Sequence, residues 1–597
     1  MIPIYTSKCS FRFSMLLLAL FMCNISFAQN TNEMLPKGFA EGEELLIPAY
    51  NTWRQNRTVA CESSPPTGSI RTMAEWEELQ GLAITWAGFT NILTQIVAAA
   101  KEQCEVIIIC SNAAVVKNQL GAAGVDWSTG ITFIEDDFDS IWMRDYGPNS
   151  VYLNDVETLA FVDWIYNRPR PEDDVVPEAI ADELSIPIYC TTSVPTDLVH
   201  TGGNFMADGL GTGFSSELVL EENDASNQWG TSNHSEADVD QIMLDFMGLD
   251  LYPKMTVLPY DAIHHIDMHM KLVNETTLIV GEYPEGIADG PQIEANIQYI
   301  LSNFTTPYGT PYRIVRIPMP PEGNSYPNTN GDYRTYTNAV FVNKTILLPV
   351  YEEQYDTTAI RIWEETMPGY EVIGIDCNAI IPLSGAIHCI TKEIGSDNPL
   401  LITHQQLPNV TTTVTDEYLV EANIKHRDGI NYAVMYYKTD LGAAYSAVAM
   451  TSMANDHWEA TIPNQPAGTV VYYYIDAEAN DGKQQVRPIT APEGYFNFTV
   501  SGIVSTEDQV ANAEIKVIFP NPASAITCIP VTTQQAITNA TIELTDVLGR
   551  SLAIVFEGDI PAGASKYFMD AAQYEAGTYF VRLSNADSSV VQKLMIK

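Results

Sequence analysis

A short segment near residue 390 combines residue types that suit nucleophilic catalysis. Ser384-Gly385-Ala386-Ile387-His388-Cys389-Ile390-Thr391 places a cysteine after a glycine-containing turn, with an imidazole directly before it. Because a thiolate held near positive charge is a strong nucleophile, Cys389 is the candidate nucleophile. Taken alone, the segment also fits a buried cysteine that packs as a small hydrophobic side chain.

The richest polar cluster of the chain is His264-His265-Ile266-Asp267-Met268-His269. On a strand, His265, Asp267 and His269 would share one face. Three readings stay open at this point. The cluster fits an imidazole and a carboxylate that act as general acid and charge clamp, a metal site with His and Asp ligands, or hydrogen-bonded strand histidines.

A third segment carries an arginine and an aspartate at a turn. Trp142-Met143-Arg144-Asp145-Tyr146-Gly147-Pro148 follows a predicted strand at Ile131 to Ile134. This order predicts a carboxylate, Asp145, at the end of a strand, where α/β folds build their sites. The alternative is an ion pair between Arg144 and Asp145 that braces the turn.

Two further segments can bind or can be structural. Asn167-Arg168-Pro169-Arg170-Pro171 is stiffened by its prolines, which also discourage a helix. Its arginines either bind a ligand or are solvated. Thr201-Gly202-Gly203-Asn204, followed by Asp208-Gly209, lets backbone approach a ligand closely, or it forms a hairpin.

These residues need a scaffold, and the pattern through about residue 405 is that of an α/β fold. Ile92 to Lys101 predicts an amphipathic helix, Glu105 to Cys110 a buried strand, and Val115 to Leu120 a second helix. Ala339 to Val342 and Thr345 to Pro349 predict neighbouring strands across an Asn343-Lys344 turn, with Asn338 directly before the first. No internal repeat is visible.

Length and charge restrict the function classes. A chain of 597 residues is too long for one core, so several domains are expected. The formal charge of −45 would repel nucleic acid and anionic lipid, so cationic substrates are expected and nucleic acid is not. Removal of Cys9 and Cys23 with a signal segment would leave seven of the nine cysteines, an odd number that requires at least one free thiol.

The N-terminus and the region after residue 408 suggest export and additional β domains. Lys8 and Arg12 precede an apolar run from Met15 to Met22 and a small-residue site at Ala28, which predicts a signal peptide over 1–28 and no membrane span. The predicted order is then a pro-segment or strap over 29–65, a catalytic domain over 66–405, a β-sandwich over 410–502, a linker over 503–514 and a last domain over 515–597.

Together the motifs WMRDYGP, TGGNFMADG, HIDMH, YTNAVFVN and GAIHCIT resemble the agmatine deiminase and bacterial peptidylarginine deiminase family, over about residues 70 to 400. Phe519 to Lys597 resembles a type IX secretion sorting domain. The resemblance implies an α/β pentein fold, a five-bladed pseudosymmetric propeller of ββαβ-type units, followed by an immunoglobulin-like sandwich and a small all-β domain. It also implies secretion or display at the cell surface, across the outer membrane.

The resemblance implies roles for these residues in the deimination of arginine-containing peptides or agmatine. Asp145 and Asp267 would hold the guanidinium, and Asn338 would orient the substrate or the nucleophile. The thiolate of Cys389 would attack the guanidinium carbon, and His265 would act first as acid and then as base. Substrate binding would involve Trp142, Arg168, Arg170 and Asp208.

The expected reaction converts peptidyl arginine, with C-terminal arginine favoured, to citrulline and ammonia, and it requires no cofactor or metal. The alternative within the family is agmatine deimination. Two other classes remain: a secreted metallohydrolase that uses His265, Asp267 and His269, and a non-catalytic surface-binding protein on the same scaffold. The turn Ser384-Gly385-Ala386 departs from the second glycine and asparagine that relatives often carry.

Overall fold

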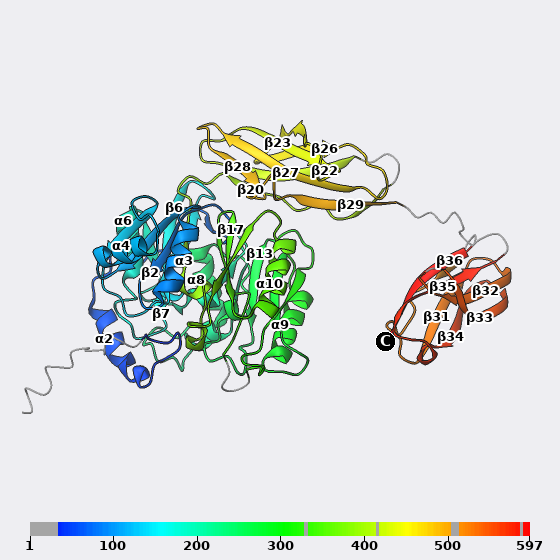
Figure 1. Cartoon of the computed structure of the whole chain (residues 1–597), viewed down its shortest axis with the longest axis horizontal. Coiled ribbons are helices and arrows are strands. Elements are labelled where there is room, and N and C mark those ends of the chain that lie inside the picture. Colours follow the sequence, from blue (N-terminus) through cyan, green and yellow to red (C-terminus); the bar gives the residue numbers. More distant parts are fainter. Residues whose placement is uncertain (1–33, 328–331, 413–416, 503–512, 548, 586–588) are drawn as a thin grey trace, which may run out of the picture. The chain divides into compact units, whose positions relative to one another are not determined.

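The structure is a computed structural model that describes residues 34–327, 332–412, 417–502, 513–547, 549–585 and 589–597 (Figure 1). The predicted signal peptide and most of the predicted linker lie outside these residues. By their contacts the residues form two compact units. The first runs to Leu407 and includes Leu419–Ile462 and Tyr472–Asn497, and the second contains Pro408–Tyr418, Pro463–Val471 and Phe498–Lys597.

The part of the first unit before residue 400 contains five small mixed sheets. They are β1 (Ile70–Thr72), β5 (Asn149–Leu153), β6 (Thr158–Asp163) and β8 (Ile188–Cys190); β10 (Met206–Ala207), β11 (Gly213–Ser216) and β12 (Lys254–Met255); β13 (Met270–Asn274), β14 (Thr277–Glu282) and β15 (Arg313–Pro318); β16 (Val340–Val342), β17 (Thr345–Val350) and β18 (Glu371–Asp376); and β19 (Lys392–Gly395), β2 (Leu79–Thr85), β3 (Glu105–Cys110) and β4 (Ile131–Glu135).

Each sheet contains the same three-strand pattern, an antiparallel pair followed by a parallel pair. Two parallel neighbours cannot be joined by a tight turn, so the chain between them crosses over through a helix. The crossover helices are α6 (Val176–Leu184), α8 (Glu236–Met247), α9 (Gly290–Asn303), α10 (Glu353–Thr366) and α3 (Thr90–Ala100).

The elements expected from hydrophobic patterning form as predicted. Helix α3 buries Ile92, Leu93, Ile96, Val97 and Ala100, which recur with the spacing of one helical face. Strand β3 is buried from its second residue to its last, as expected for a strand between two parallel neighbours. The predicted hairpin across Asn343-Lys344 also forms, because β16 and β17 pair antiparallel.

The turn before the first strand of each pattern carries the residues of interest. These turns are α5 (Met143–Tyr146) before β5, η2 (Gly202–Asn204) before β10, η3 (Ile266–Met268) before β13, Asn338 before β16, and η5 (His388–Ile390) before β19. The last pattern combines a late strand with two early strands. Strand β19 pairs antiparallel with β2, with Lys392 opposite Ala83, and β2 pairs parallel with β3. Residues far apart in sequence therefore occupy equivalent positions in the fold.

Two local expectations are wrong. Asp145 lies in the single helical turn α5, not at the end of a strand. The segment His264 to His269 is not a strand either, since η3 is a 3₁₀ turn and His264 has a φ of 58°. In such a turn alternate residues do not share a face, so His265, Asp267 and His269 point in different directions.

From residue 400 onward the described chain is almost entirely β (Figure 1). Strand β22 (Tyr418–Lys425) alternates buried and exposed residues, as a strand with one solvated face does. Further strands of this region are β20 (Leu401–Thr403), β21 (Val410–Thr412), β23 (Ile430–Lys438), β24 (Ser446–Ala449), β25 (Thr451–Ser452), β26 (His457–Ile462), β27 (Val470–Ala479), β28 (Gln484–Arg487) and β29 (Phe496–Gly502).

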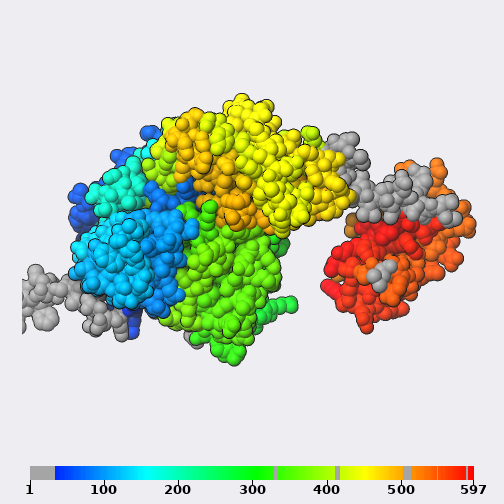
Figure 2. All heavy atoms as spheres, turned by 45° about the horizontal axis from the view of Figure 1, so that its top comes forward, coloured from blue at the N-terminus to red at the C-terminus, as the bar shows by residue number. Residues whose placement is uncertain are grey.

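The C-terminal part forms one closely packed group of atoms, orange to red in the space-filling view (Figure 2). Its core includes Ile529, Val531, Ile542, Leu544 and Val581. The strands are β30 (Ala513–Ile515), β31 (Ile526–Thr533) and β34 (Gly563–Asp570) in one sheet, and β33 (Ser551–Ile560), β32 (Ile537–Thr545), β35 (Gly577–Ser584) and β36 (Ser589–Ile596) in the other.

No helix within the described ranges is long and apolar enough to cross a membrane.

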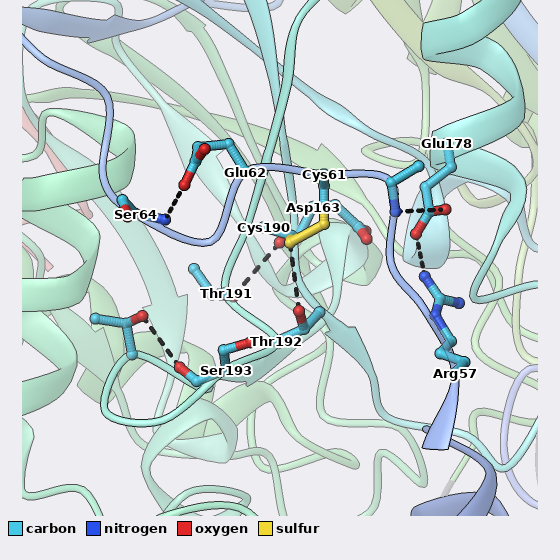
Figure 3. The surroundings of a disulfide bond; sticks show 12 residues. Arg57, Cys61, Glu62, Ser64, Asp163, Glu178, Cys190, Thr191, Thr192 and Ser193 are labelled. Atoms are coloured by element: carbon cyan, nitrogen blue, oxygen red, sulfur yellow. Dashed lines mark hydrogen bonds and ion pairs between the residues drawn. A yellow bond between two sulfur atoms is a disulfide. The ribbon is translucent and has the colours of Figure 1, made fainter. Parts of the chain in front are cut away.

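The N-terminal segment is tied to the α/β part of the chain by a disulfide. After η1 (Glu43–Leu46) and α2 (Ile47–Asn56), Cys61 bonds to Cys190 at the end of β8, beside an ion pair between Arg57 and Glu178 (Figure 3). The expectation of a free thiol is confirmed. The free cysteines of the described chain are Cys104, Cys110, Cys377, Cys389 and Cys528.

The remaining short elements are β7 (Ile165–Tyr166), β9 (Val199–His200), α4 (Ala113–Ala122), α7 (Leu218–Glu221), η4 (Ile381–Leu383) and η6 (Ala571–Gln573).

Candidate active site

Cys389 lies at the centre of the polar cluster formed by the equivalent turns. It is fully buried. Asn338 Nδ2 donates to its sulfur at 3.1 Å, Asp267 Oδ2 lies 3.6 Å from the sulfur, and Lys37 Nζ lies 2.8 Å from it. Burial raises the pKa of the Cys389 thiol to about 12; the Asp267 charge adds to this rise and Lys37 opposes it. In this arrangement the thiol is protonated at neutral pH.

Asp145 and Asp267 face a common cation. Lys37 Nζ lies 3.7 Å from Asp145 Oδ1 and 3.8 Å from Asp267 Oδ2. Burial would raise the pKa of Asp267, but Lys37 and a hydrogen bond from His388 hold it well below its usual range. Burial raises the pKa of Asp145, and the opposing effect of Lys37 is smaller. Both carboxylates are therefore arranged to pair with positive charge.

His265 borders the same space. Its Nδ1 atom lies 3.5 Å from Asp145 Oδ1, and neither ring nitrogen has a hydrogen-bond partner among the residues that the structure describes. Burial, reinforced by Lys37, holds the pKa of His265 well below its usual range. The imidazole is therefore neutral in this arrangement.

His388 connects Asp267 to a carboxylate that the sequence did not suggest. Its Nδ1 lies 2.8 Å from Asp267 Oδ2 and its Nε2 lies 3.0 Å from Glu75 Oε1. Glu75 also pairs with Lys271. Sequence reasoning noted His388 only as a neighbour of the cysteine and missed Glu75. No spacing rule links residues 75, 267 and 388, so nothing in the sequence indicated this chain of contacts.

Two glycines make room for the site. A Cβ atom at Gly203 would lie 2.5 Å from His265 Nδ1, 2.8 Å from Asp145 Oδ1 and 3.0 Å from Lys37 Nζ. A Cβ atom at Gly385 would lie 2.4 Å from a ring carbon of Trp142 and 3.0 Å from Cys389 Cβ. The sequence left two interpretations of the Gly202-Gly203 turn, a close approach of backbone to a ligand and a hairpin. These distances fit the close approach.

Lys37 was also missed as a site residue. It belongs to the segment expected to be a pro-segment or strap, and its side chain is only 1% exposed. Asp145, Asp267 and Cys389 keep its pKa above the usual lysine value despite the opposing effect of burial. The one available signal was weak: Lys37 is the only basic residue between Arg12 and Arg54.

The predicted substrate-binding residues Trp142, Arg168 and Arg170 all contact this N-terminal segment. Trp142 Nε1 donates to the carbonyl of Leu35 at 2.9 Å. Arg168 Nε donates to the carbonyl of Lys37 at 3.0 Å, and Arg170 Nη2 donates to the carbonyl of Pro36 at 2.8 Å. The arginines are 5% and 1% exposed, so the solvated reading is wrong and both side chains reach the same segment.

Asp208 lies apart from these contacts. Its Oδ1 accepts the backbone N–H groups of Leu210 and Thr212, and it closes the turn between β10 and β11. Burial raises the pKa of Asp208 to about 6. These partners fit the alternative prediction for this segment, in which Asp208 belongs to a hairpin turn.

The three residues proposed as metal ligands of a metallohydrolase do not bring their ligand atoms together. Among the described residues, sets of three ligand atoms that lie close together are formed by Glu421, His457 and Glu459 and by His426, Asp428 and Asp481. His265, Asp267 and His269 form no such set. The directions that η3 imposes on these three residues explain the difference.

Comparisons with known proteins match the region that contains this site. The family model for Porphyromonas-type peptidyl-arginine deiminase matches residues 71–394, more than half of the chain. The model for the secretion system C-terminal sorting domain matches residues 517–597. An agmatine deiminase predicted in Vibrio parahaemolyticus is 24% identical over 294 residues, which cover 44% of this chain and 78% of that protein.

Solved structures resemble the same region. The X-ray structure of a predicted agmatine deiminase superposes with a TM-score of 0.50 at 21% identity, covering 57% of this chain and 100% of that one. The agmatine deiminase of Enterococcus faecalis gives a TM-score of 0.48 at 18% identity, with coverage of 56% and 100%. At these identities the first likeness supports the fold alone.

The C-terminal domain implies export by the type IX secretion machinery, to the cell surface or beyond it. The catalytic part is assigned by its own match, which spans the turns that carry Asp145, Asp267, Asn338 and Cys389. The chain therefore belongs to the Porphyromonas-type peptidyl-arginine deiminase family, whose members are hydrolases that act on carbon–nitrogen bonds of amidines, and it ends in a secretion sorting domain.

Proposed function

We propose that the protein deiminates peptidyl arginine, with C-terminal arginine preferred, to citrulline and ammonium. The observation that carries this proposal is the set of unpaired acceptors around the thiol. Asp145 Oδ1 and Asp267 Oδ1 are buried and have no hydrogen-bond partner in the described part of the chain. A guanidinium offers five N–H donors in one plane, more than an ammonium does, and it suits two facing carboxylates.

In the first half of the reaction, the guanidinium of the substrate lies between Asp145 and Asp267. Because His265 is neutral and the thiol carries its proton, His265 acts first as a base and not, as expected from the sequence, as an acid: it takes the proton of the Cys389 thiol, and the sulfur forms a bond to the guanidinium carbon. His265 then returns the proton to one amino group, the carbon–nitrogen bond breaks, and ammonia leaves. Asn338, whose amide lies 3.1 Å from the sulfur, holds the nucleophile in line. The product of this half is a thiouronium on Cys389.

In the second half, water replaces ammonia. His265, neutral again, takes a proton from water while the oxygen bonds to the thiouronium carbon. The carbon–sulfur bond breaks, His265 passes its proton to Cys389, and citrulline is released once the second proton of the water has left the oxygen and converted the departed ammonia to ammonium. The balance is one arginine and one water giving one citrulline and one ammonium.

Arg168 and Arg170 support a substrate that carries a carboxylate. Arg170 already binds a carboxylate, that of Glu43, through Nε at 2.7 Å and Nη2 at 3.1 Å. The free carboxylate of a C-terminal arginine can take the same fork. Agmatine is the second candidate because relatives carry that name, but it has no carboxylate for these arginines to bind.

The arrangement of the domains and the route of export are also proposed. We infer a five-bladed pseudosymmetric propeller from the repeated strand and helix pattern, an immunoglobulin-like sandwich over 410–502, and a signal peptide over 1–28 that precedes type IX export.

The test compares kcat/KM for a peptide that ends in arginine, its C-terminal amide and agmatine. The full chain, Arg168→Ala and Arg170→Ala are assayed, with Cys389→Ser as the inactive reference. We expect the free acid to rank first in the unmodified protein and to lose that rank in the two alanine variants. Activity in folded Cys389→Ser would refute the covalent mechanism, and equal rates for acid and amide would refute the carboxylate preference.

A further inference from the structure

The N-terminal segment Leu35–Glu43 fills the site that the proposed function assigns to the substrate. The ammonium of Lys37 lies 2.8 Å from Cys389 Sγ and within 3.8 Å of both carboxylates. The guanidinium of a substrate must occupy this same position, because it has to contact the thiol and both carboxylates at once. Lys37 and a substrate guanidinium therefore exclude each other.

The backbone around Lys37 is held as a bound peptide would be. The N–H of Lys37 donates to the carbonyl of Leu383 at 3.0 Å, and its own carbonyl accepts from Arg168. The neighbouring carbonyls of Pro36 and Gly38 both accept from Arg170 Nη2, at 2.8 and 3.0 Å. These contacts need no particular side chain on the peptide, so a different peptide can use the same donors and acceptor.

Glu43 supplies the second charge of a substrate. Its carboxylate binds Arg170 through both oxygens, and the pair is almost completely buried. Phe39 lies under the guanidinium of Arg168, 4.6 Å from ring centroid to Cζ. The segment thus presents a cation to the carboxylates and a carboxylate to Arg170, which is the charge pattern of arginine with a free carboxyl group.

We infer that Leu35–Glu43 is a built-in substrate mimic that keeps the enzyme latent, an inference that rests on the proposed function. Lysine has no guanidinium carbon, so the thiol has nothing to attack and the segment is not consumed. The enzyme becomes active when the segment leaves the site. The stretch between α2 and Cys61 lies outside the helices and strands and exposes Thr58 and Ala60, so a protease can cut there and free the segment.

A competing role for Lys37 makes the opposite prediction. If Lys37 were a catalytic residue that stabilises the thiolate, its removal would make Cys389 less reactive. If it is an occupant, its removal makes Cys389 more reactive. The sign of one measurement separates the two.

The experiment measures alkylation of Cys389 by 2-chloroacetamidine, a small amidine-bearing reagent, with the modified residue identified by mass spectrometry. The full chain is compared with Lys37→Ala and Glu43→Gln, and Lys344→Ala serves as a control at an exposed lysine. We expect the alkylation rate and the turnover of arginine peptides to rise at least about tenfold in the first two variants, because the fraction of open sites rises. Glu43 does not touch the thiol, so its variant tests occupancy even if Lys37→Ala fails to fold.

An unchanged or lower alkylation rate in both variants would overturn the inference. A higher alkylation rate without deimination of any arginine substrate would keep the inference and refute the proposed function. Lys37→Arg adds an independent readout, because it places a guanidinium carbon beside the thiol. We expect residue 37 to be converted to citrulline within the chain, an exchange of NH for O that mass spectrometry detects, and to stay unmodified when Cys389→Ser is added. Persistence of arginine at position 37 in a chain that deiminates added peptides would place the guanidinium elsewhere and overturn the mimicry.

Discussion

Arg144 and Glu393 form a buried bidentate ion pair, with Nη1 to Oε1 at 2.9 Å and Nη2 to Oε2 at 2.6 Å. The pair joins the residue before Asp145 to the strand that follows Cys389. Arg144 Nε also donates to the carbonyl of His388 at 3.2 Å. Two of the turns that carry the site are therefore held together by one side chain.

Loss of this pair should cost stability. Glu393→Gln leaves the Arg144 charge buried without its partner, and we expect the free energy of unfolding to fall by about 3 kcal/mol. The matched control is Glu365→Gln, which breaks an exposed pair with Arg361 and should cost less than about 0.5 kcal/mol. Denaturant unfolding of both variants provides the comparison, and equal losses would contradict the role assigned to burial.

The two carboxylates should matter for catalysis more than for folding. We expect Asp145→Asn and Asp267→Asn each to lower kcat/KM for arginine peptides at least about 10²-fold, because each removes a charge that faces the substrate cation. Asp182→Asn, at an exposed position on α6, is the control and should leave kcat/KM unchanged. A smaller loss in either site variant, with the fold intact by circular dichroism, would show that this carboxylate does not hold the substrate guanidinium.

Gly203 should tolerate no side chain. The methyl group of Gly203→Ala would lie 2.5 Å from His265 Nδ1 and 2.8 Å from Asp145 Oδ1, so these groups must move from their positions. We expect a loss of at least about 10²-fold in kcat/KM, since displacement of about 1 Å at reacting groups has this effect. Gly121→Ala, in a helix with its nearest side-chain atom at 3.5 Å, should have full activity. Comparable activity in the two variants would show that His265 and Asp145 can move to accommodate the methyl group without loss of catalysis.

His200 should make stability depend on pH. Its Nδ1 accepts the N–H of Thr201 and its Nε2 lies 2.7 Å from the hydroxyl of Tyr252, an arrangement that requires the neutral ring. Burial lowers the pKa of His200 to about 3, against 6.5 for the ordinary value. Between these values the unfolded chain binds the proton and the folded chain does not, so acidification favours unfolding.

The contribution of His200 is therefore present above pH 6.5 and is lost as the pH falls toward 3, at about 1.4 kcal/mol per pH unit. Denaturant unfolding between pH 7.5 and pH 5 should show a shallower pH dependence in His200→Gln than in the unmodified protein. Parallel curves for the two proteins would mean that His200 binds its proton as readily in the folded state as in the unfolded state.

Much of the local structure was predictable because it depends on local pattern. The buried strand Glu105–Cys110 and the helix after residue 90 follow from hydrophobic runs and spacing. The site turns were found through motifs, each of which lies directly before a strand. The strand predicted for His264 to His269 failed because alternation of histidines and apolar residues resembles a strand pattern, whereas the chain turns at η3.

What the sequence did not reveal is the equivalence of distant turns. Asp145, Asp267 and Cys389 each precede the first strand of a pattern that recurs in the fold, yet no sequence repeat marks it. What recurs is the order and direction of the strands, and very different side chains can form the same arrangement of strands. Contacts such as those of Lys37 and Glu75 depend on this convergence, so local reasoning could not find them.

The disulfide between Cys61 and Cys190 determines which cuts can release the N-terminal segment. A cut after Cys61 leaves the segment attached through the sulfur bridge, whereas a cut between Glu43 and Cys61 separates it. While it remains attached, the segment acts as an intramolecular ligand at an effective concentration on the order of millimolar. A free peptide of equal intrinsic affinity must reach that concentration before it occupies half of the sites, so attachment protects neighbouring proteins from the enzyme at ordinary peptide concentrations.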